Sequence, residues 1–312
     1  MPGKDNLKRG FFSDPLRVCK AVATNQLARF APAFYVRLTG ETGRGKSVYT
    51  PEQTAAYFRQ CVAEYFEVLK LSPKAGEDFL RGRHILEYGP GDIPGVALLL
   101  VAMGAERVTC VDRFPLMALS EYNQAVMRVL LNGLTDTQRD RAAGCFRVGG
   151  DPASGLAENG PLRYLTNRNG LSDMRGEVSL VLSRAVLEHV HDVEAIFADM
   201  RRALEPGGIA LHQVDLKSHG LHRQNPLDFL TWSPFLWRLM YSEKGVPNRL
   251  RRFAFVRAAE KAGLNIELMQ PTVLAESKDV AAVRPQLADV FRLLDDEELS
   301  WLGFWMKCRA PR

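Results

Sequence analysis

The residues best suited to chemistry lie in one short stretch of the chain, residues 84–112. An apolar pair precedes the run Glu87-Tyr88-Gly89-Pro90-Gly91, and Asp112 follows at the end of the next apolar run. Glycines without a Cβ atom let a ligand approach the backbone closely. A carboxylate at the end of the second strand can take the two hydroxyls of a ribose. The spacing therefore predicts a site for a nucleoside-containing cofactor.

The residues around these glycines indicate which cofactor to expect. A dinucleotide fingerprint reads Gly-x-Gly-x-x-Gly, but Pro94 stands at the third glycine position. Glu87 suits a cationic ammonium group, directly or through water, and would not help to hold a pyrophosphate. An apolar pair, an acid and then x-Gly-x-Gly resemble the first motif of the class I S-adenosylmethionine-dependent methyltransferases. A tight strand–helix turn of another α/β protein is the alternative.

Two later motifs resemble the same family and occur in the same order. They are Leu-Ser-x-x-Val-Leu-Glu-His-Val at residues 182–190 and Leu-x-Pro-Gly-Gly at residues 204–208. The resemblance covers residues 80–215 well. It implies an α/β, doubly wound, Rossmann-like sheet of seven strands, mostly parallel with the last strand antiparallel. S-adenosylmethionine is then the expected cofactor.

The expected cofactor-binding residues follow from these strand ends and from the resemblance. We expect a third strand at 145–149, after which Asp151 would accept the exocyclic amine of adenine. A fourth strand at 177–183 would end at Ser183. The full expected set is Glu87, Tyr88, Gly89, Gly91, Asp112, Arg113, Asp151 and Ser183.

The expected catalytic residues follow the fifth apolar run, residues 209–215. Ligands of open α/β sheets bind outside the carboxyl ends of the strands, so Asp215 and His219 are expected beside the methyl acceptor. His219 would act as a base with Asp215 orienting it, or both would be loop residues bonded to the backbone. His189 and His191 follow the fourth strand, where a base could also sit or cap a helix. The histidines show no metal-ligand spacing with cysteine, so no metal site is expected.

The elements that position these residues divide the chain into two expected parts. Residues 1–80 form a helical extension, and residues 81–312 form the cofactor-binding domain, with 216–249 as an aromatic insertion or lid. Residues 1–50 carry nine Lys or Arg and three acids. A helix at 16–30 in this basic arm would either pack as a cap on the core or contact an anionic surface.

Two alternative functions remain open on the sequence. Residues Gly40–Ser47 match the phosphate-binding pattern Gly-x(4)-Gly-Lys-Ser, as in a nucleotide hydrolase built on Lys46. That mechanism needs a helix starting at Lys46, whereas Thr50 and Pro51 predict a start near 51. The other alternative uses S-adenosylmethionine as a substrate, in a cyclase that releases methylthioadenosine. The favoured function is methyl transfer to oxygen, with a weak resemblance to enzymes of bacterial surface-glycan clusters.

Composition narrows the class of protein. The chain has 312 residues, 46% of them hydrophobic, which suffices for one large core with extensions. The sequence contains no run of 18 apolar residues and no apolar leader, so a cytoplasmic protein is expected. The five cysteines show no paired spacing, so their thiols are expected to be reduced. The basic residues are dispersed and no recognised nucleic-acid module appears, so a small-molecule or glycan acceptor is expected rather than nucleic acid.

Overall fold

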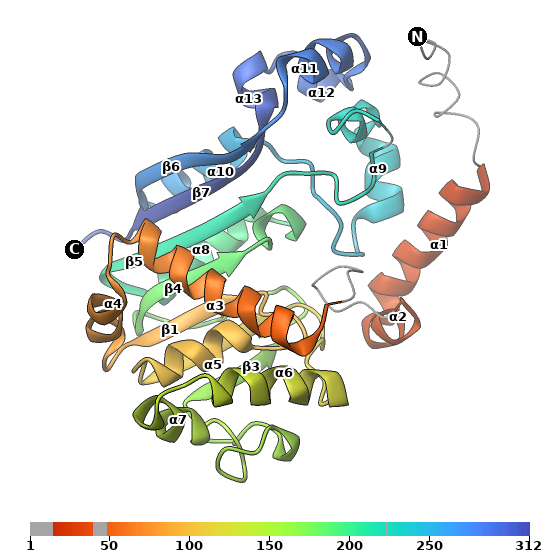
Figure 1. Cartoon of the computed structure of the whole chain (residues 1–312). Helices are drawn as coiled ribbons and strands as arrows, with labels where there is room; N and C mark the ends of the chain where they lie inside the picture. The colour runs from red at the N-terminus through yellow and green to blue at the C-terminus, as the bar shows by residue number, and fades with distance from the viewer. Residues whose placement is uncertain (1–14, 40–48, 223) are drawn as a thin grey trace.

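A seven-stranded sheet forms the centre of the computed structural model, which describes residues 15–39, 49–222 and 224–312 (Figure 1). Its strand order is β3-β2-β1-β4-β5-β7-β6, and only β7 runs antiparallel to its neighbours. This order confirms the doubly wound fold expected from the sequence. The strands are β1 His84–Tyr88, β2 Arg107–Asp112, β3 Leu162–Thr166, β4 Val178–Arg184, β5 Leu204–Asp215, β6 Asn265–Leu274 and β7 Trp301–Arg309.

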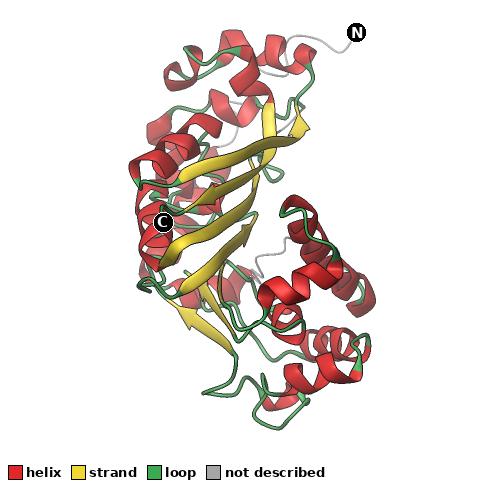
Figure 2. Cartoon of the chain, turned by 90° about the vertical axis from the view of Figure 1, so that its left-hand side faces the viewer, coloured by secondary structure: helices red, strands yellow, loops and turns green. Residues whose placement is uncertain are grey.

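Helices cover both faces of the sheet, as Figure 2 shows. One core cluster joins the sheet to α3, α5 and α6, and a second joins it to α8 and α10. The helices up to α8 are α1 Pro15–Phe30, α2 Pro32–Thr39, α3 Pro51–Val68, α4 Pro73–Leu80, α5 Gly95–Ala102, α6 Glu121–Asn132, α7 Asp136–Ala143 and α8 Val193–Ala203. The later ones are α9 Pro234–Tyr241, α10 Arg252–Lys261, α11 Ser277–Val283, α12 Asp289–Arg292 and α13 Asp296–Ser300.

Helix α3 belongs to the main core. Thr50 caps it with the expected capping box, in which its side chain accepts from the Gln53 N–H while Gln53 accepts from the Thr50 N–H. A Cβ on Gly95, the first residue of α5, would lie 2.3 Å from the Phe58 ring. The glycine therefore lets α3 and α5 pack closely over β1.

Helices α1, α2 and α9 stand beyond the carboxyl ends of the parallel strands (Figure 1). Asn25 of α1 donates to the Leu239 carbonyl of α9 at 3.0 Å and accepts from the Glu243 N–H at 2.8 Å. Helix α1 thus packs on α9. Phe30, Phe34 and Leu38 of α1 and α2 remain exposed.

One prediction about local structure was wrong. Residues 145–149 are not a strand: Phe146 makes a single bridge to Leu156, because Gly149, Gly150 and then Pro152 interrupt regular pairing. The true β3 is Leu162–Thr166. Residues 275–300 form α11, α12 and α13, with a 3₁₀ turn between the first two.

Short 3₁₀ turns occur at four positions in the described ranges, and the last of them is the turn between α11 and α12: η2 Pro152–Ser154, η3 Leu187–His189, η4 Asp228–Thr231 and η5 Arg284–Gln286. Over those same ranges, none of the helices has the length and apolar character needed to span a bilayer. All five cysteines are free, and Cys19 alone of them is exposed.

Candidate active site

The glycine turn after β1 is held against two neighbouring segments. Gly89 and Gly91 have φ angles of +66° and +72°, which L-residues with side chains rarely adopt. The Gly89 N–H donates to the Val111 carbonyl of β2 at 2.8 Å. A Cβ on Gly89 would lie 2.3 Å from the side chain of Val186, in the segment after β4. The turn therefore fits tightly between β2 and the chain that leaves β4.

Asp112 lies beside this turn, at the end of β2. It is 8% exposed, and its carboxylate accepts the Phe114 N–H at 2.9 Å and an N–H of Gly91. Burial raises the pKa of Asp112 to about 6, and the backbone N–H groups of Phe114, Gly91 and Arg113 oppose that rise. The structure thus brings the predicted acid and the predicted glycines together.

Glu87 and Tyr88 point to opposite faces of the sheet, as consecutive strand residues must. The Glu87 carboxylate is 7% exposed, and the Cys110 thiol donates to it at 3.6 Å. Burial raises the pKa of Glu87 to about 7, opposed by the Cys110 thiol and the Ala97 N–H. The Tyr88 hydroxyl donates to Asp199 of α8. The Tyr88 side chain is therefore part of the core beneath α8, and only its backbone borders the turn.

Ser183 and Arg113 also have partners within the protein. The fully buried Ser183 hydroxyl shares a hydrogen bond of 2.8 Å with His212 Nδ1, between β4 and β5. The Arg113 guanidinium lies 4.7 Å from the Phe114 ring centroid and donates to the Glu243 carbonyl. Arg113 thereby connects the end of β2 to the segment after α9.

Asp151 does not lie at the end of a strand. Its side chain accepts the Ala153 N–H at 3.0 Å and caps η2. Asn167 is the residue that follows β3, and its N–H donates to the Asp112 carbonyl at 2.9 Å. The premise that put Asp151 near adenine was therefore wrong, because the strand on which it rested is absent from the described fold.

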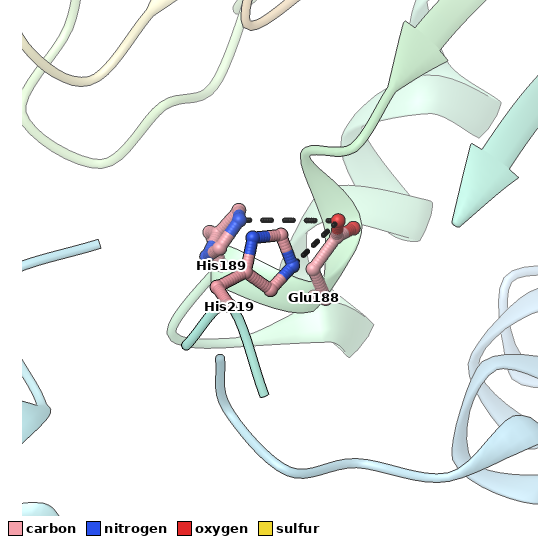
Figure 3. A group of neighbouring side chains, drawn as sticks. All are labelled: Glu188, His189 and His219. Atoms are coloured by element: carbon pink, nitrogen blue, oxygen red, sulfur yellow. Dashed lines mark ion pairs between the residues drawn. The ribbon is translucent and has the colours of Figure 1, made fainter. Parts of the chain in front are cut away.

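A second group of polar residues lies at the carboxyl ends of β4 and β5 (Figure 3). Glu188 and His189 stand on η3, directly after β4, and His219 follows β5. Glu188 Oε1 is 3.8 Å from His189 Nε2 and 3.9 Å from His219 Nε2. The two imidazole rings meet edge to face, with centroids 4.8 Å apart. We call these three residues the Glu188–His189–His219 cluster.

The electrostatics of this cluster are unusual. Glu188 is 1% exposed, and neither carboxylate oxygen has a hydrogen-bond partner among the described residues. Burial raises the pKa of Glu188 well above its ordinary value and lowers the pKa of His189 to about 3. The His219 side chain is 32% exposed. The cluster therefore runs from a buried acid to an imidazole that meets solvent.

Asp215 does not orient His219 with its carboxylate. Its Oδ1 accepts the Lys217 N–H at 3.0 Å, and its Oδ2 lies 3.1 Å from Lys217 Nζ. His219 Nε2 is instead 3.4 Å from the Asp215 carbonyl oxygen. The expected Asp215–His219 pair is thus replaced by Glu188, which the sequence analysis did not single out. The available signal was an acid next to a histidine just after a buried strand.

Asn248 holds the turn that carries Glu188 and His189. Its N–H donates to the Glu188 carbonyl at 2.6 Å, and its side-chain amide donates to the carbonyls of Leu187 and Val190 at 3.0 and 3.1 Å. Three hydrogen bonds from one residue fix η3 relative to the segment before α10.

The phosphate-binding pattern at Gly40–Ser47 lies outside the described residues. The following helix, α3, begins at Pro51 with Thr50 as its cap.

Comparison with known proteins gives one family and several distant structures. A family model described as a methyltransferase domain matches residues 57–268, which is more than half of the chain. No curated protein matches the chain. Among solved structures, the chain is similar to an S-adenosylmethionine-dependent methyltransferase from Mesorhizobium loti, with 17% identity and a TM-score of 0.41 over 74% of this chain and 92% of that one.

Two other solved structures resemble the chain with comparably low identity and TM-score. Phosphoethanolamine N-methyltransferase 2 from Haemonchus contortus shows 15% identity and a TM-score of 0.42 over 74% of this chain and 49% of that one. A geranyl diphosphate methyltransferase shows 13% identity and a TM-score of 0.41 over 75% and 76%. Likenesses this distant say nothing about the acceptor of this chain.

Proposed function

The chain belongs to the class I S-adenosylmethionine-dependent methyltransferases, and we propose that it methylates a hydroxyl oxygen of a small molecule or glycan. One observation carries the proposal: the Glu188–His189–His219 cluster lies at the carboxyl ends of β4 and β5. A hydroxyl must lose its proton as the new bond to carbon forms, and imidazoles beside a carboxylate are suited to take it.

The other half of the proposed site holds the cofactor. Strand order reverses between β1 and β4, and crevices at such switch points bind ligands in this class of sheet. Asp112 fits the ribose hydroxyls, since its carboxylate is buried beside the glycine turn. Gly89 and Gly91 leave room for the ligand near the backbone. Glu87 is assigned to the ammonium group, directly or through water.

The remaining members of the predicted set are assigned supporting roles. Tyr88 and Ser183 border the crevice through their backbones, because both side chains are buried and bonded within the protein. Arg113 connects the cofactor side to the segment after α9. Asp151 is not retained in the set.

The protein contributes alignment and proton removal. Bound S-adenosylmethionine supplies an electrophilic methyl group on a sulfonium centre. His219 is the exposed member of the cluster, so we assign it the proton of the acceptor. Asp215 pairs with Lys217 beside it and would set the local charge. We assign residues 216–249, together with α1, which packs on α9, to a cap on the acceptor side of the site. The boundary at residue 80 between the helical extension and the cofactor-binding domain stays a prediction.

Product analysis tests the proposal. Purified protein is incubated with S-adenosylmethionine and a panel of hydroxylated small molecules and glycans, and its by-products are separated. S-adenosylhomocysteine together with an O-methylated acceptor supports the proposal. Methylthioadenosine would identify the cyclase alternative, and an N-methylated product would overturn the choice of oxygen.

A variant pair locates the base. A positioned general base contributes about 10²–10⁴-fold to the rate, so His219→Ala should lower turnover by about 10²-fold or more. The affinity for S-adenosylhomocysteine should stay nearly unchanged. His222→Ala is the matched control, because its exposed imidazole bonds to Ser218 and not to the cluster. Equal losses in both variants would remove His219 from the proposed role.

A further inference from the structure

We propose that Glu188, His189 and His219 form a binding site for a divalent transition-metal ion. Each residue offers one ligand atom, and the three atoms lie within 4.8 Å of one another. They lie on the segments that follow two neighbouring parallel strands, β4 and β5, so the sheet brings these segments together. The expectation of no metal site rested on cysteine–histidine spacing, which does not detect a glutamate paired with histidines from two strand ends.

The distances within the cluster suit a central ion. Zinc binds imidazole nitrogen and carboxylate oxygen at about 2.0–2.2 Å, so its ligand atoms are separated from each other by about 3–4 Å. The Glu188 oxygen is 3.8 and 3.9 Å from the two imidazole nitrogens. These separations are too long for hydrogen bonds. They match the separation of ligand atoms around one ion, and Figure 3 shows the two ion pairs that join the Glu188 carboxylate to the imidazoles.

The burial of Glu188 is an independent observation that points to a cation. Its carboxylate is 1% exposed, and both oxygens lack hydrogen-bond partners in the described part of the chain. Within that part the ion pairs of Glu188 are with the two imidazoles, and the Lys217 charge acts on it only from a longer range while Lys217 Nζ pairs with Asp215 Oδ2. A buried acid without a partner is costly, and a divalent ion would supply the missing charge.

The support around the cluster is also typical of a metal site. Asn248 fixes the η3 backbone on both sides of Glu188 and His189, which sets the direction of both side chains. His219 has a φ of +50° and precedes Gly220 at +81°, so the chain turns back sharply where His219 reaches the cluster. Backbone held in this way limits how far the ligand atoms can move apart.

The donor set indicates the class of ion. Two imidazoles and one carboxylate suit zinc, iron, cobalt or nickel, whereas magnesium and calcium prefer oxygen ligands. Three protein ligands leave at least one open position, which is the arrangement of catalytic rather than structural sites. This role rests on the proposed function: an acceptor hydroxyl at the open position would lose its proton more easily, and His219 would then hold the ion instead of the proton.

Direct metal binding tests the inference. Full-length protein is stripped with a chelator, and Zn²⁺, Mn²⁺ and Mg²⁺ are titrated separately by calorimetry, with Co²⁺ absorption to report imidazole coordination. We expect one equivalent of Zn²⁺ to bind far more tightly than Mg²⁺. Glu188→Gln and His219→Ala should each weaken Zn²⁺ binding at least 100-fold, and His222→Ala should not change it. Absence of Zn²⁺ binding, or equal binding by all variants, would overturn the site.

Thermal melting of Glu188→Gln gives a second readout. The variant keeps the shape of the side chain but offers the ion no anionic oxygen. It should therefore lose the rise in melting temperature that Zn²⁺ gives the parent. A Zn²⁺-induced rise that survives in the variant contradicts the site.

The failures of the two proposals are distinguishable. Methyl transfer that persists in metal-free protein, with no Zn²⁺ bound, removes the metal site and leaves the proposed function. Zn²⁺ binding through Glu188 and His219 without any O-methylated product leaves the metal site and removes the proposed function.

Discussion

Asp112 should make nucleoside binding depend on pH. Burial raises the pKa of Asp112 from 3.8 to about 6 in the free protein. Ribose hydroxyls donate to a carboxylate, so the ionised form binds and the bound ligand keeps it ionised. Affinity should therefore be full well above pH 6 and should fall as the pH drops through about 6.

The size of the effect follows from the ionised fraction. With a pKa of about 6, Asp112 is roughly ten parts ionised to one part protonated at pH 7, and the ratio reverses at pH 5. The association constant should fall about tenfold from pH 7 to pH 5, which corresponds to about 1.4 kcal/mol. Calorimetry with methylthioadenosine measures it best, because this ligand carries the ribose but no ammonium group for Glu87 to meet.

Two variants separate Asp112 from other titrating groups. Asp112→Asn should weaken binding at pH 7 by about 1.5–3 kcal/mol, since a charge-assisted bond is lost, and its affinity should not vary between pH 5 and 7. Glu87→Gln should keep the pH dependence of the parent. If the parent shows no change between pH 5 and 7, or Asp112→Asn keeps the same slope, the ribose contact is wrongly assigned.

Three further predictions concern the elements that hold the site. Burial raises the pKa of Glu87 from 4.5 to about 7, so between these pH values the folded protein retains a proton that the unfolded chain releases. The free energy of unfolding should therefore fall by about 3 kcal/mol as the pH rises from 4.5 to about 7. In urea unfolding of the ligand-free proteins, the fall in stability should be smaller by that amount in Glu87→Gln than in the parent. Gly89→Ala should lower the free energy of unfolding by about 2–4 kcal/mol, because position 89 has a φ of +66° and the new Cβ would meet Val186. Gly82→Ala is the control, since position 82 has a φ of +69° but open space around it, and it should cost only about 1–2 kcal/mol in the same assay. Asn248→Ala should lower kcat at least tenfold with S-adenosylhomocysteine affinity unchanged, because it frees η3; a parallel loss of affinity would show general damage instead.

The sequence predicted the parts of the fold that local chemistry determines. The turn at Gly89, the capping box at Thr50 and the end of β2 at Asp112 are each encoded within a few residues. The third strand was misplaced because Cys145–Gly149 and Leu162–Thr166 are alike in composition, each with one arginine among apolar residues. Its place in the sheet comes from pairing with β2, a long-range contact that apolarity alone does not reveal.

The acceptor side was harder to predict for the same reason. Glu188 and His219 are 31 positions apart in the sequence, and they meet because β4 and β5 pair in parallel register and both end at the same edge. Asp215 is nearer to His219 along the chain, yet its carboxylate turns to Lys217. Sequence proximity therefore favoured Asp215, whereas the sheet brings the Glu188 carboxylate to the imidazole.

The close contact between Gly89 and Val186 gives the two halves of the proposed site a fixed relation. Val186 leads directly into η3, so the glycine turn on the cofactor side and Glu188 on the acceptor side are joined through one packed pair and one short turn. Transfer of a methyl group requires donor and acceptor to be aligned, and misplacement by about 1 Å can cost about 10²-fold in rate. An alanine at position 89 would therefore act at both ends: it would strain the cofactor turn and push η3, with Glu188 and His189, away from it. We accordingly expect Gly89→Ala to lower kcat more than its loss of stability explains, when rates are compared at a temperature where both proteins are folded.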